Sequence, residues 1–119
     1  MSQLAAYKDN TISTQNKGRL IVLLYDGAIK FLKLAIKEMD AGNQEAKGQY
    51  INRAADVITE LNAILDMEQG GEIAANLRKL YTFMNDRLTQ ANIKQDPDMV
   101  RDVIKLLEEL NQGWRVITG

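Results

Sequence analysis

Histidine and cysteine are both absent from the 119 residues of the chain. Their absence excludes a thiolate nucleophile, a Ser–His or Cys–His catalytic pair, and the common zinc sites, which need these ligands. It also excludes the usual carboxylate-bridged di-iron bundle, because each half of that site needs a Glu-x-x-His pair. We therefore expect no metal centre and no nucleophilic active site of these kinds.

Phosphate-binding glycine motifs are missing as well. The sequence contains neither Gly-x-Gly-x-x-Gly nor the Gly-x-x-x-x-Gly-Lys-Ser/Thr loop, and its eight glycines fall mostly at apparent helix ends or singly within helices. The adjacent Glu108 and Glu109 would point about 100° apart on a helix, so they indicate solvated surface and not a shared acid–base site. The sequence therefore predicts a protein that is not an enzyme and binds no cofactor.

An excess of one charge and a long apolar run are also lacking. With 15 basic and 16 acidic residues the formal net charge is −1, so the basic surface expected of a nucleic-acid-binding protein is missing. The longest apolar run, residues 20–25, is far shorter than the roughly 20 residues that a membrane-spanning helix needs. Residues 1–17 are polar and do not resemble a secretory signal. We expect a cytoplasmic protein without membrane insertion, and the lack of cysteine agrees with that compartment.

What the sequence does contain is one segment with unusually extensive apolar surface, residues 20–39. Projected as a helix, it confines Asp26, Lys30, Lys33 and Lys37 to an arc of roughly 60°, whereas the apolar arc covers roughly 260°. An ordinary core-facing helix has an apolar stripe of a little over 100°. Two explanations stay open: this helix is central among sister helices, or part of its surface binds a partner.

Apolar periodicity and capping residues predict four helices. Asn16 is a suitable first cap, Gly42 suits a left-handed helix end, Gly70-Gly71 interrupts the pattern, and Pro97 suits a first helical position. The predicted helices cover residues 17–41, 44–68, 71–93 and 97–117. No segment alternates with the period of a strand. Helices of about 20 residues joined by short loops predict an all-α, antiparallel up-down-up-down four-helix bundle over residues 16–119.

Residues 1–15 lie outside this bundle. They are mostly polar, but Leu4, Tyr7 and Ile12 provide apolar side chains. One interpretation is a frayed terminus. The other is a loosely docked cap segment that covers apolar surface weakly and leaves when a better ligand binds.

Several runs of the sequence resemble one known family. Residues 20–32, LIVLLYDGAIKFL, resemble the start of the flagellin-specific export chaperones of the FliS family, which serve bacterial flagellar type III secretion. Residues 51–61, 70–81 and 87–92 and Trp114 continue the similarity with compatible spacing. The resemblance covers about residues 4–117, so it is far more specific than any single motif.

This resemblance implies a small antiparallel helical bundle that binds the C-terminal segment of flagellin in the cytoplasm. Such a chaperone prevents early polymerisation and helps deliver its client to a component of the flagellar export gate. In the family an N-terminal segment with a tyrosine lies over part of the flagellin-binding surface, and Tyr7 matches that tyrosine. One departure is that Asn16-Lys17 stands where many relatives begin the first helix with Ser-Pro. Asn16 still suits the cap, but the proline that would define the helix start is missing.

The predicted partner-binding residues come from three places. From residues 20–39 we predict that one flank faces the partner: Val22, Tyr25, Ile29, Leu32 and Ile36. The other flank would then face the core: Leu20, Leu24, Ala28, Phe31 and Ala35. Phe83 projects roughly 60° beyond its helix's core stripe and is a separate candidate, and Tyr7 and Ile12 belong to the cap segment. Ordinary packing between helices is the alternative for each residue. The alternative function is a self-associating structural or adaptor bundle without a secretion client.

Overall fold

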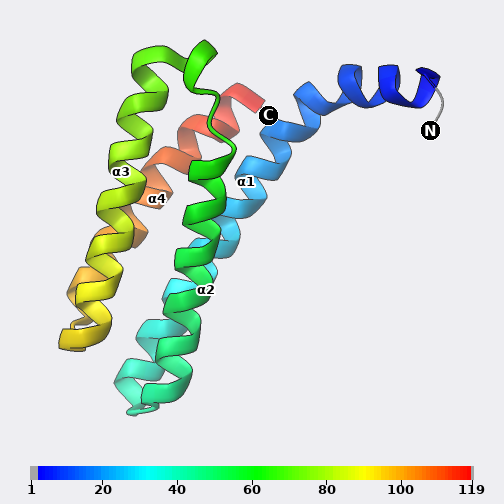
Figure 1. The fold of residues 1–119 in the computed structure, drawn as a ribbon. Coiled ribbons are helices and arrows are strands. Elements are labelled where there is room, and N and C mark those ends of the chain that lie inside the picture. Colours follow the sequence, from blue (N-terminus) through cyan, green and yellow to red (C-terminus); the bar gives the residue numbers. More distant parts are fainter. Residues whose placement is uncertain (1–2, 119) are drawn as a thin grey trace.

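The computed structural model describes the backbone of residues 3–118 and the side chains of residues 17–117. It consists of four helices: α1 (Gln3–Ala41), α2 (Gln44–Ala63), α3 (Met67–Lys94) and α4 (Pro97–Thr118) (Figure 1). No strand occurs in the described backbone. The expected all-α class is confirmed.

Short polar connections end each helix and allow the chain to turn. Gly42 adopts a positive φ of 80° after α1, and its N–H donates to the carbonyl of Met39 at 3.1 Å. After α3, Gln95 is left-handed with a φ of 54°. The carboxylate of Asp96 then accepts the N–H of Asp98 at 3.0 Å, with Pro97 as the first residue of α4. Gly42 and Pro97 thus lie at the turn and first helical positions that the sequence indicated.

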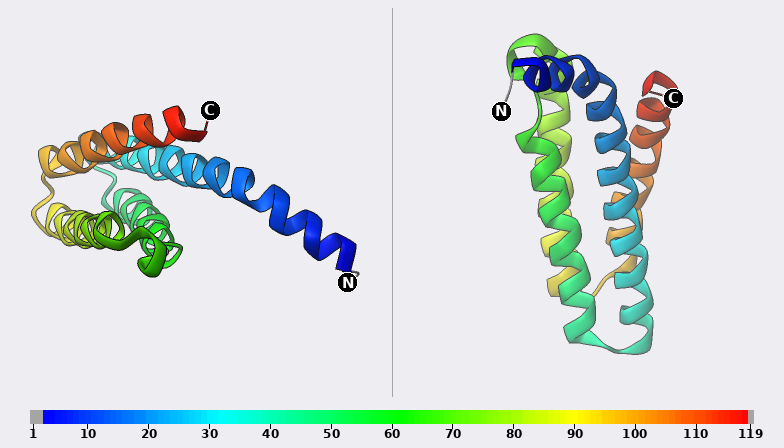
Figure 2. Two further views of the ribbon diagram at one scale, coloured as in Figure 1. Left: turned by 90° about the horizontal axis from the view of Figure 1, so that it is seen from above. Right: turned by 90° about the vertical axis from the view of Figure 1, so that its right-hand side faces the viewer.

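The chain reverses direction at each connection, so successive helices run in opposite directions (Figure 1). Helix α1 contacts α2 and α4, and α3 contacts the same two helices from the other side. Viewed from above, α1 and α4 form one layer that lies over a second layer of α2 and α3 (Figure 2). The core is therefore enclosed by all four helices.

Each helix contributes buried side chains to this core at spacings of three and four residues, as expected for helices packed side by side. The largest fully buried side chains are Tyr25, Leu32, Ile58, Leu61, Tyr81, Met84, Leu88, Val100, Val103 and Leu107. At the end that holds the α1–α2 connection, the Lys47 side chain is buried and donates to the carbonyl of Asn92 at 3.2 Å. This contact joins the start of α2 to the end of α3.

Two predicted helix boundaries were wrong. We expected the first helix to begin at residue 17 with Asn16 as its cap, whereas α1 begins at Gln3 and its first turns project past the bundle (Figures 1 and 2). Residues 3–16 contain neither proline nor glycine, so nothing in the backbone chemistry interrupts the helix there. The side chains of Tyr7 and Ile12 lie outside the described residues, and the capping role of this segment stays a prediction.

The second correction concerns the connection between α2 and α3. We expected helices ending at residue 68 and beginning at residue 71, but α2 ends at Ala63 and α3 begins at Met67. The side chain of Asp66 accepts the N–H of Gln69 at 3.0 Å and caps a first turn, Met67–Gly70. The glycine pair therefore makes a kink inside α3 and not the gap between two helices.

Candidate functional site

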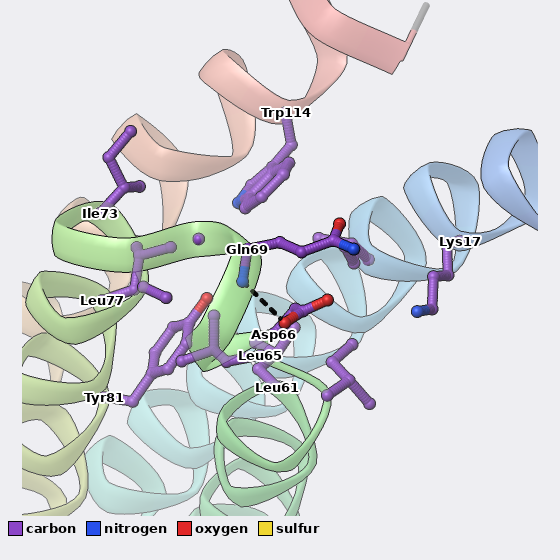
Figure 3. Close-up of a pocket in the computed structure, with 13 residues that line it drawn as sticks. Lys17, Leu61, Leu65, Asp66, Gln69, Ile73, Leu77, Tyr81 and Trp114 are labelled. Carbon is purple, nitrogen blue, oxygen red and sulfur yellow. Dashed lines mark hydrogen bonds between the residues drawn. The ribbon is translucent and has the colours of Figure 1, made fainter.

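A well-defined hollow lies at the end of the bundle where α1 leaves it. We call it the end pocket; its volume is about 420 Å³, and all four helices and the α2–α3 connection contribute to it (Figure 3). Its lining is Lys17, Ile21, Leu61, Ile64, Leu65, Asp66, Gln69, Gly70, Ile73, Ala74, Leu77, Tyr81 and Trp114. Most of these side chains are apolar, with polar groups from Lys17, Asp66 and Gln69 among them. The site can hold apolar side chains of a partner.

Ile73 is the most exposed apolar side chain of the pocket lining, with 72% of its surface open to solvent. An aliphatic side chain in that position gains free energy when a partner covers it. Ile93, near the other end of α3, is also 72% exposed but does not line the pocket. The two isoleucines differ in location and not in exposure.

The kink in α3 shapes one wall of the pocket. Gly71 has φ 52° and ψ −126°, a conformation that only glycine adopts without strain. A Cβ added to Gly70 would lie 2.6 Å from the Cβ of Ala74, which is closer than carbon atoms pack. The two glycines together turn Met67–Gly70 out of line with the rest of α3, so that Asp66, Gln69 and Gly70 border the pocket.

At the base of the pocket lies a pair of buried tyrosines. The hydroxyl oxygens of Tyr25 and Tyr81 are 2.5 Å apart, within hydrogen-bonding distance. Burial raises the pKa of Tyr25, against a smaller lowering effect of the bonds with Tyr81 and Trp114. Burial likewise raises the pKa of Tyr81, and the contact with Tyr25 raises it further. Both hydroxyls therefore stay protonated at neutral pH, and one of them donates the hydrogen bond between the two tyrosines.

Contacts between α4 and α1 hold Trp114 at the pocket. The carboxylate of Asp26 on α1 accepts the side-chain N–H of Asn111 at 2.8 Å and two bonds from Arg115, at 2.7 and 2.8 Å. Asn111 and Arg115 are one helical turn apart, so they anchor the same side of α4 on either side of Trp114. The tryptophan lies above the pocket in Figure 3.

A second, shallower groove runs between α3 and α4 and includes Phe83. This side chain is 47% exposed, and the Arg87 guanidinium carbon lies 6.0 Å from its ring centre. Arg87 also donates to Asp102 on α4 at 2.7 Å. Phe83 is thus accessible, as expected for a residue beyond the core stripe of its helix.

The structure corrects the division of α1 into a partner flank and a core flank. Tyr25, Ile29 and Leu32, which we expected to face a partner, are buried in the core, and Val22 and Ile36 are half-buried. Of the expected core flank, Ala28 and Ala35 are buried and Leu24 and Phe31 are half-buried, but Leu20 is 49% exposed.

The physical reason is that α1 lies between α2 and α4, so the side facing both helices is buried. That side repeats at Tyr25, Ala28, Leu32 and Ala35, which is a spacing of three, four and three residues. The excess apolar surface is real but lies on the outer face, where Leu23 is 65% exposed beside Leu20. Helical projection correctly indicated excess apolar surface on α1, but it assigned that surface to the wrong side of the helix.

Sequence reasoning did not find the end pocket. By helical spacing, Ile73, Leu77 and Tyr81 fit the apolar core stripe of one helix, and Ile64 and Leu65 fit that of the preceding helix, so the spacing does not mark them as pocket residues. The one available signal was Gly70-Gly71 between two apolar segments, because adjacent glycines permit a turn that brings distant side chains together.

Within the described residues, no group of three or more acidic side chains is arranged to hold a metal ion. In the same part of the chain, no helix combines the length and apolar character needed to cross a membrane. The chemistry of the site is that of apolar contacts with a few hydrogen-bonding groups.

Comparison with known proteins identifies the family to which this site belongs. The family described as flagellar protein FliS matches residues 1–119, the entire chain. The chain belongs to the FliS family. This confirms the resemblance inferred from residues 4–117. FliS proteins are chaperones and not enzymes, in agreement with the sequence-based prediction.

Three relatives show the extent of the similarity. A flagellar secretion chaperone FliS of Vibrio cholerae is 40% identical over 115 residues, covering 93% of this chain and 85% of the relative. Those of Bacillus subtilis and Salmonella typhimurium are 33% identical over 110 residues and 36% over 111. Each of these two alignments covers 92% of this chain, with 81% and 82% of the respective relative. The FliS similarity therefore includes every element that lines the end pocket.

Proposed function

We propose that this chain is a cytoplasmic export chaperone that binds the disordered C-terminal segment of flagellin. It prevents premature polymerisation and assists delivery of flagellin to a component of the flagellar type III export gate. Membership of a family of flagellar secretion chaperones supports the export role. The flagellin segment is the client because the resemblance of residues 20–32 is to flagellin-specific chaperones.

The observation that carries this proposal is an apolar pocket of about 420 Å³ assembled from all four helices, with the exposed Ile73 in its lining. A disordered segment binds such a bundle by placing apolar side chains in grooves and folding as it does so. The ordering cost of several kcal/mol offsets part of the gain, so a large contact area remains compatible with release. Protection and later release are both required of an export chaperone.

The client contacts more than the pocket in this proposal. Leu20 and Leu23 on the outer face of α1 are accessible apolar side chains, and Val22 and Ile36 retain partial exposure. Phe83 is a further contact in the α3–α4 groove. Tyr25, Ile29 and Leu32 act indirectly, because their burial holds α1 in place. A client that wraps around the bundle reaches these surfaces in succession.

The N-terminal segment acts as a cap in the same proposal. Tyr7 and Ile12 lie upstream of Lys17 and Ile21, which line the end pocket, so the segment is attached beside the site. A weakly bound cap is displaced by the client and shields the apolar surface when the client is absent. Removal of residues 1–15 is expected to leave the bundle helical and client binding intact. Complete loss of binding with normal helicity would instead make the segment part of the binding site.

A pair of variants on α3 tests the pocket. Ile73→Lys places a charge in the pocket lining and removes an aliphatic contact, whereas Ile93→Lys makes the same change at equal exposure near the far end of α3. Burying an isoleucine side chain contributes about 1.5–3 kcal/mol, so we expect Ile73→Lys to weaken binding of a C-terminal flagellin fragment at least tenfold. Ile93→Lys should bind as the unchanged protein does. Fluorescence anisotropy of the labelled fragment measures both.

Equal binding by both variants would contradict a role of the end pocket. The self-associating adaptor bundle is tested by light scattering with and without the fragment. A stable homodimer that the fragment does not alter would favour the adaptor, whereas a defined complex with the fragment supports the chaperone.

A further inference from the structure

The deepest part of the end pocket is closed to solvent. Leu61, Ala74, Leu77 and Tyr81 line the pocket, yet each of these side chains is buried. We call these four residues the pocket floor. Contacts with buried apolar side chains stabilise a complex only when the ligand can reach them. Access to the floor therefore depends on the walls around it.

One wall of the pocket is residues 66–70, which we call the capped turn. Three of its members line the pocket, and in Figure 3 Gln69 lies between Trp114 and Leu61. Four of its five residues are exposed, and Gly70 is half-buried. The capped turn therefore places no side chain in the core, so its displacement sacrifices little apolar burial. Segments with so few buried contacts open at a low cost in free energy.

The capped turn is a self-contained unit between two joints. The Asp66 carboxylate accepts the N–H of Gln69 at 3.0 Å, and the Asp66 carbonyl accepts that of Gly70 at 2.8 Å. Both bonds lie inside the turn, so movement of the whole turn breaks neither. One joint is Gly71, with φ 52° and ψ −126°, and the other is Leu65, whose N–H bond to the end of α2 is long, at 3.4 Å. Hinges consist of a few such residues at the ends of helices.

We propose that the capped turn is a lid of the end pocket. It covers the floor in the free protein and swings outward about Gly71 and Leu65 to admit an apolar side chain of the client. This inference rests on the proposed function of the end pocket as a client site. Because only the open form accepts the client, the apparent affinity is that of the open form multiplied by its fraction. Closure competes with the client for the floor, so the lid limits affinity and favours release.

Gly70 offers a variant that opens the lid. An added Cβ would lie 2.6 Å from the Cβ of Ala74, which the backbone of α3 holds in place. The clash is relieved when the turn moves away from this floor residue. We expect Gly70→Ala to bind the C-terminal flagellin fragment at least about threefold more tightly, through faster association. The double variant Gly70→Ala/Ala74→Gly removes the clash and should bind as Ala74→Gly alone does.

The position of the lid can be measured without the client. The sequence contains no cysteine, so introduced cysteines carry spin labels only where intended. One pair joins the exposed Glu68 on the lid to the exposed Gln90 in the straight part of α3, and the control pair joins Asn76 to Gln90, about 21 Å apart along the helix. Double electron–electron resonance should show a shift of the lid pair when the fragment binds. Gly70→Ala should shift the lid pair in the same direction without the fragment, and the control pair should not change.

Two results would overturn the proposal. If Gly70→Ala shifts the lid pair but binds the fragment no more tightly, an open lid does not help the client to enter. If the lid pair has the same distance distribution in the free protein, the complex and Gly70→Ala, the capped turn is a fixed wall. Circular dichroism verifies folding, and the lid pair in the otherwise unchanged chain tests the movement even if Gly70→Ala does not fold.

Failure of the lid differs from failure of the pocket. If Ile73→Lys weakens binding but the lid pair never shifts, the pocket remains the client site and only the lid is rejected. If Ile73→Lys binds normally, the function proposed for the pocket fails, and with it the role of the lid in client binding. The label distances of free Gly70→Ala still show whether the capped turn moves.

Discussion

Replacing Gly71 by alanine tests the kink that shapes the end pocket. Its φ of 52° and ψ of −126° lie in a region where a residue with a Cβ is strained by about 1–3 kcal/mol. Alanine avoids this strain only if α3 straightens. Straightening would remove the hydrogen bond of the Asp66 cap, which contributes about 1 kcal/mol, and would displace the pocket wall. We therefore expect Gly71→Ala to lower the free energy of unfolding by about 1–2 kcal/mol.

Gly27→Ala is the matched control for this substitution. Gly27 lies within α1, has helical backbone, and has no atom within 4 Å of an added Cβ. Alanine is there expected to raise the free energy of unfolding by about 0.5–1 kcal/mol, because it restricts the unfolded chain and favours the helix. Urea unfolding followed by far-UV circular dichroism measures both changes. If Gly71→Ala stabilises the protein as Gly27→Ala does, α3 is straight and the reasoning is refuted.

Three other predictions concern separate contacts. Burial raises the pKa values of Tyr25 and Tyr81, so above pH 10 these groups ionise more readily in the unfolded chain than in the folded protein. The free energy of unfolding should therefore keep its full value below the ordinary tyrosine pKa of about 10. Above that pH it should fall by up to about 1.4 kcal/mol per pH unit for each tyrosine. Urea unfolding of the double phenylalanine variant should show a shallower alkaline decline, and an equal decline would contradict this. Asp26→Asn should cost less than about 1 kcal/mol globally but speed amide hydrogen exchange near Arg115, and unchanged exchange there would count against the α1–α4 contact. Phe83→Ser should change stability by less than about 1 kcal/mol while weakening client binding; a much larger loss of stability would assign Phe83 to packing.

Local chemistry made much of the fold predictable. Gly42 and Pro97 occupy the conformations that their chemistry favours. The α1–α2 and α3–α4 connections therefore lie where the sequence predicts them. The start of α1 was misjudged because Asn16 is a good cap residue, yet a possible cap does not end a helix that nothing interrupts. The preference of one residue for a cap position is a weaker signal than an uninterrupted helix-forming segment on both sides of it.

The site was less predictable because it depends on contacts between distant segments. Nearly all of residues 20–36 are apolar, so the helical period has no clear phase, and only the positions of α2 and α4 determine that Tyr25 is buried and Leu23 exposed. Ile73 fits an apolar stripe by spacing, but the kink at Gly71 places it in the pocket lining with most of its surface open. Projection of single helices contains no information about either arrangement.

The central claim is that an apolar pocket in the four-helix bundle binds the C-terminal segment of flagellin, and calorimetric titration tests it most directly. A C-terminal flagellin fragment is titrated into the full-length protein at several temperatures. The account predicts saturable binding with a strongly negative heat-capacity change, the signature of apolar burial coupled to folding of the fragment. The account would be contradicted if an independent anisotropy measurement also detected no binding, or if the fragment bound with no change in heat capacity.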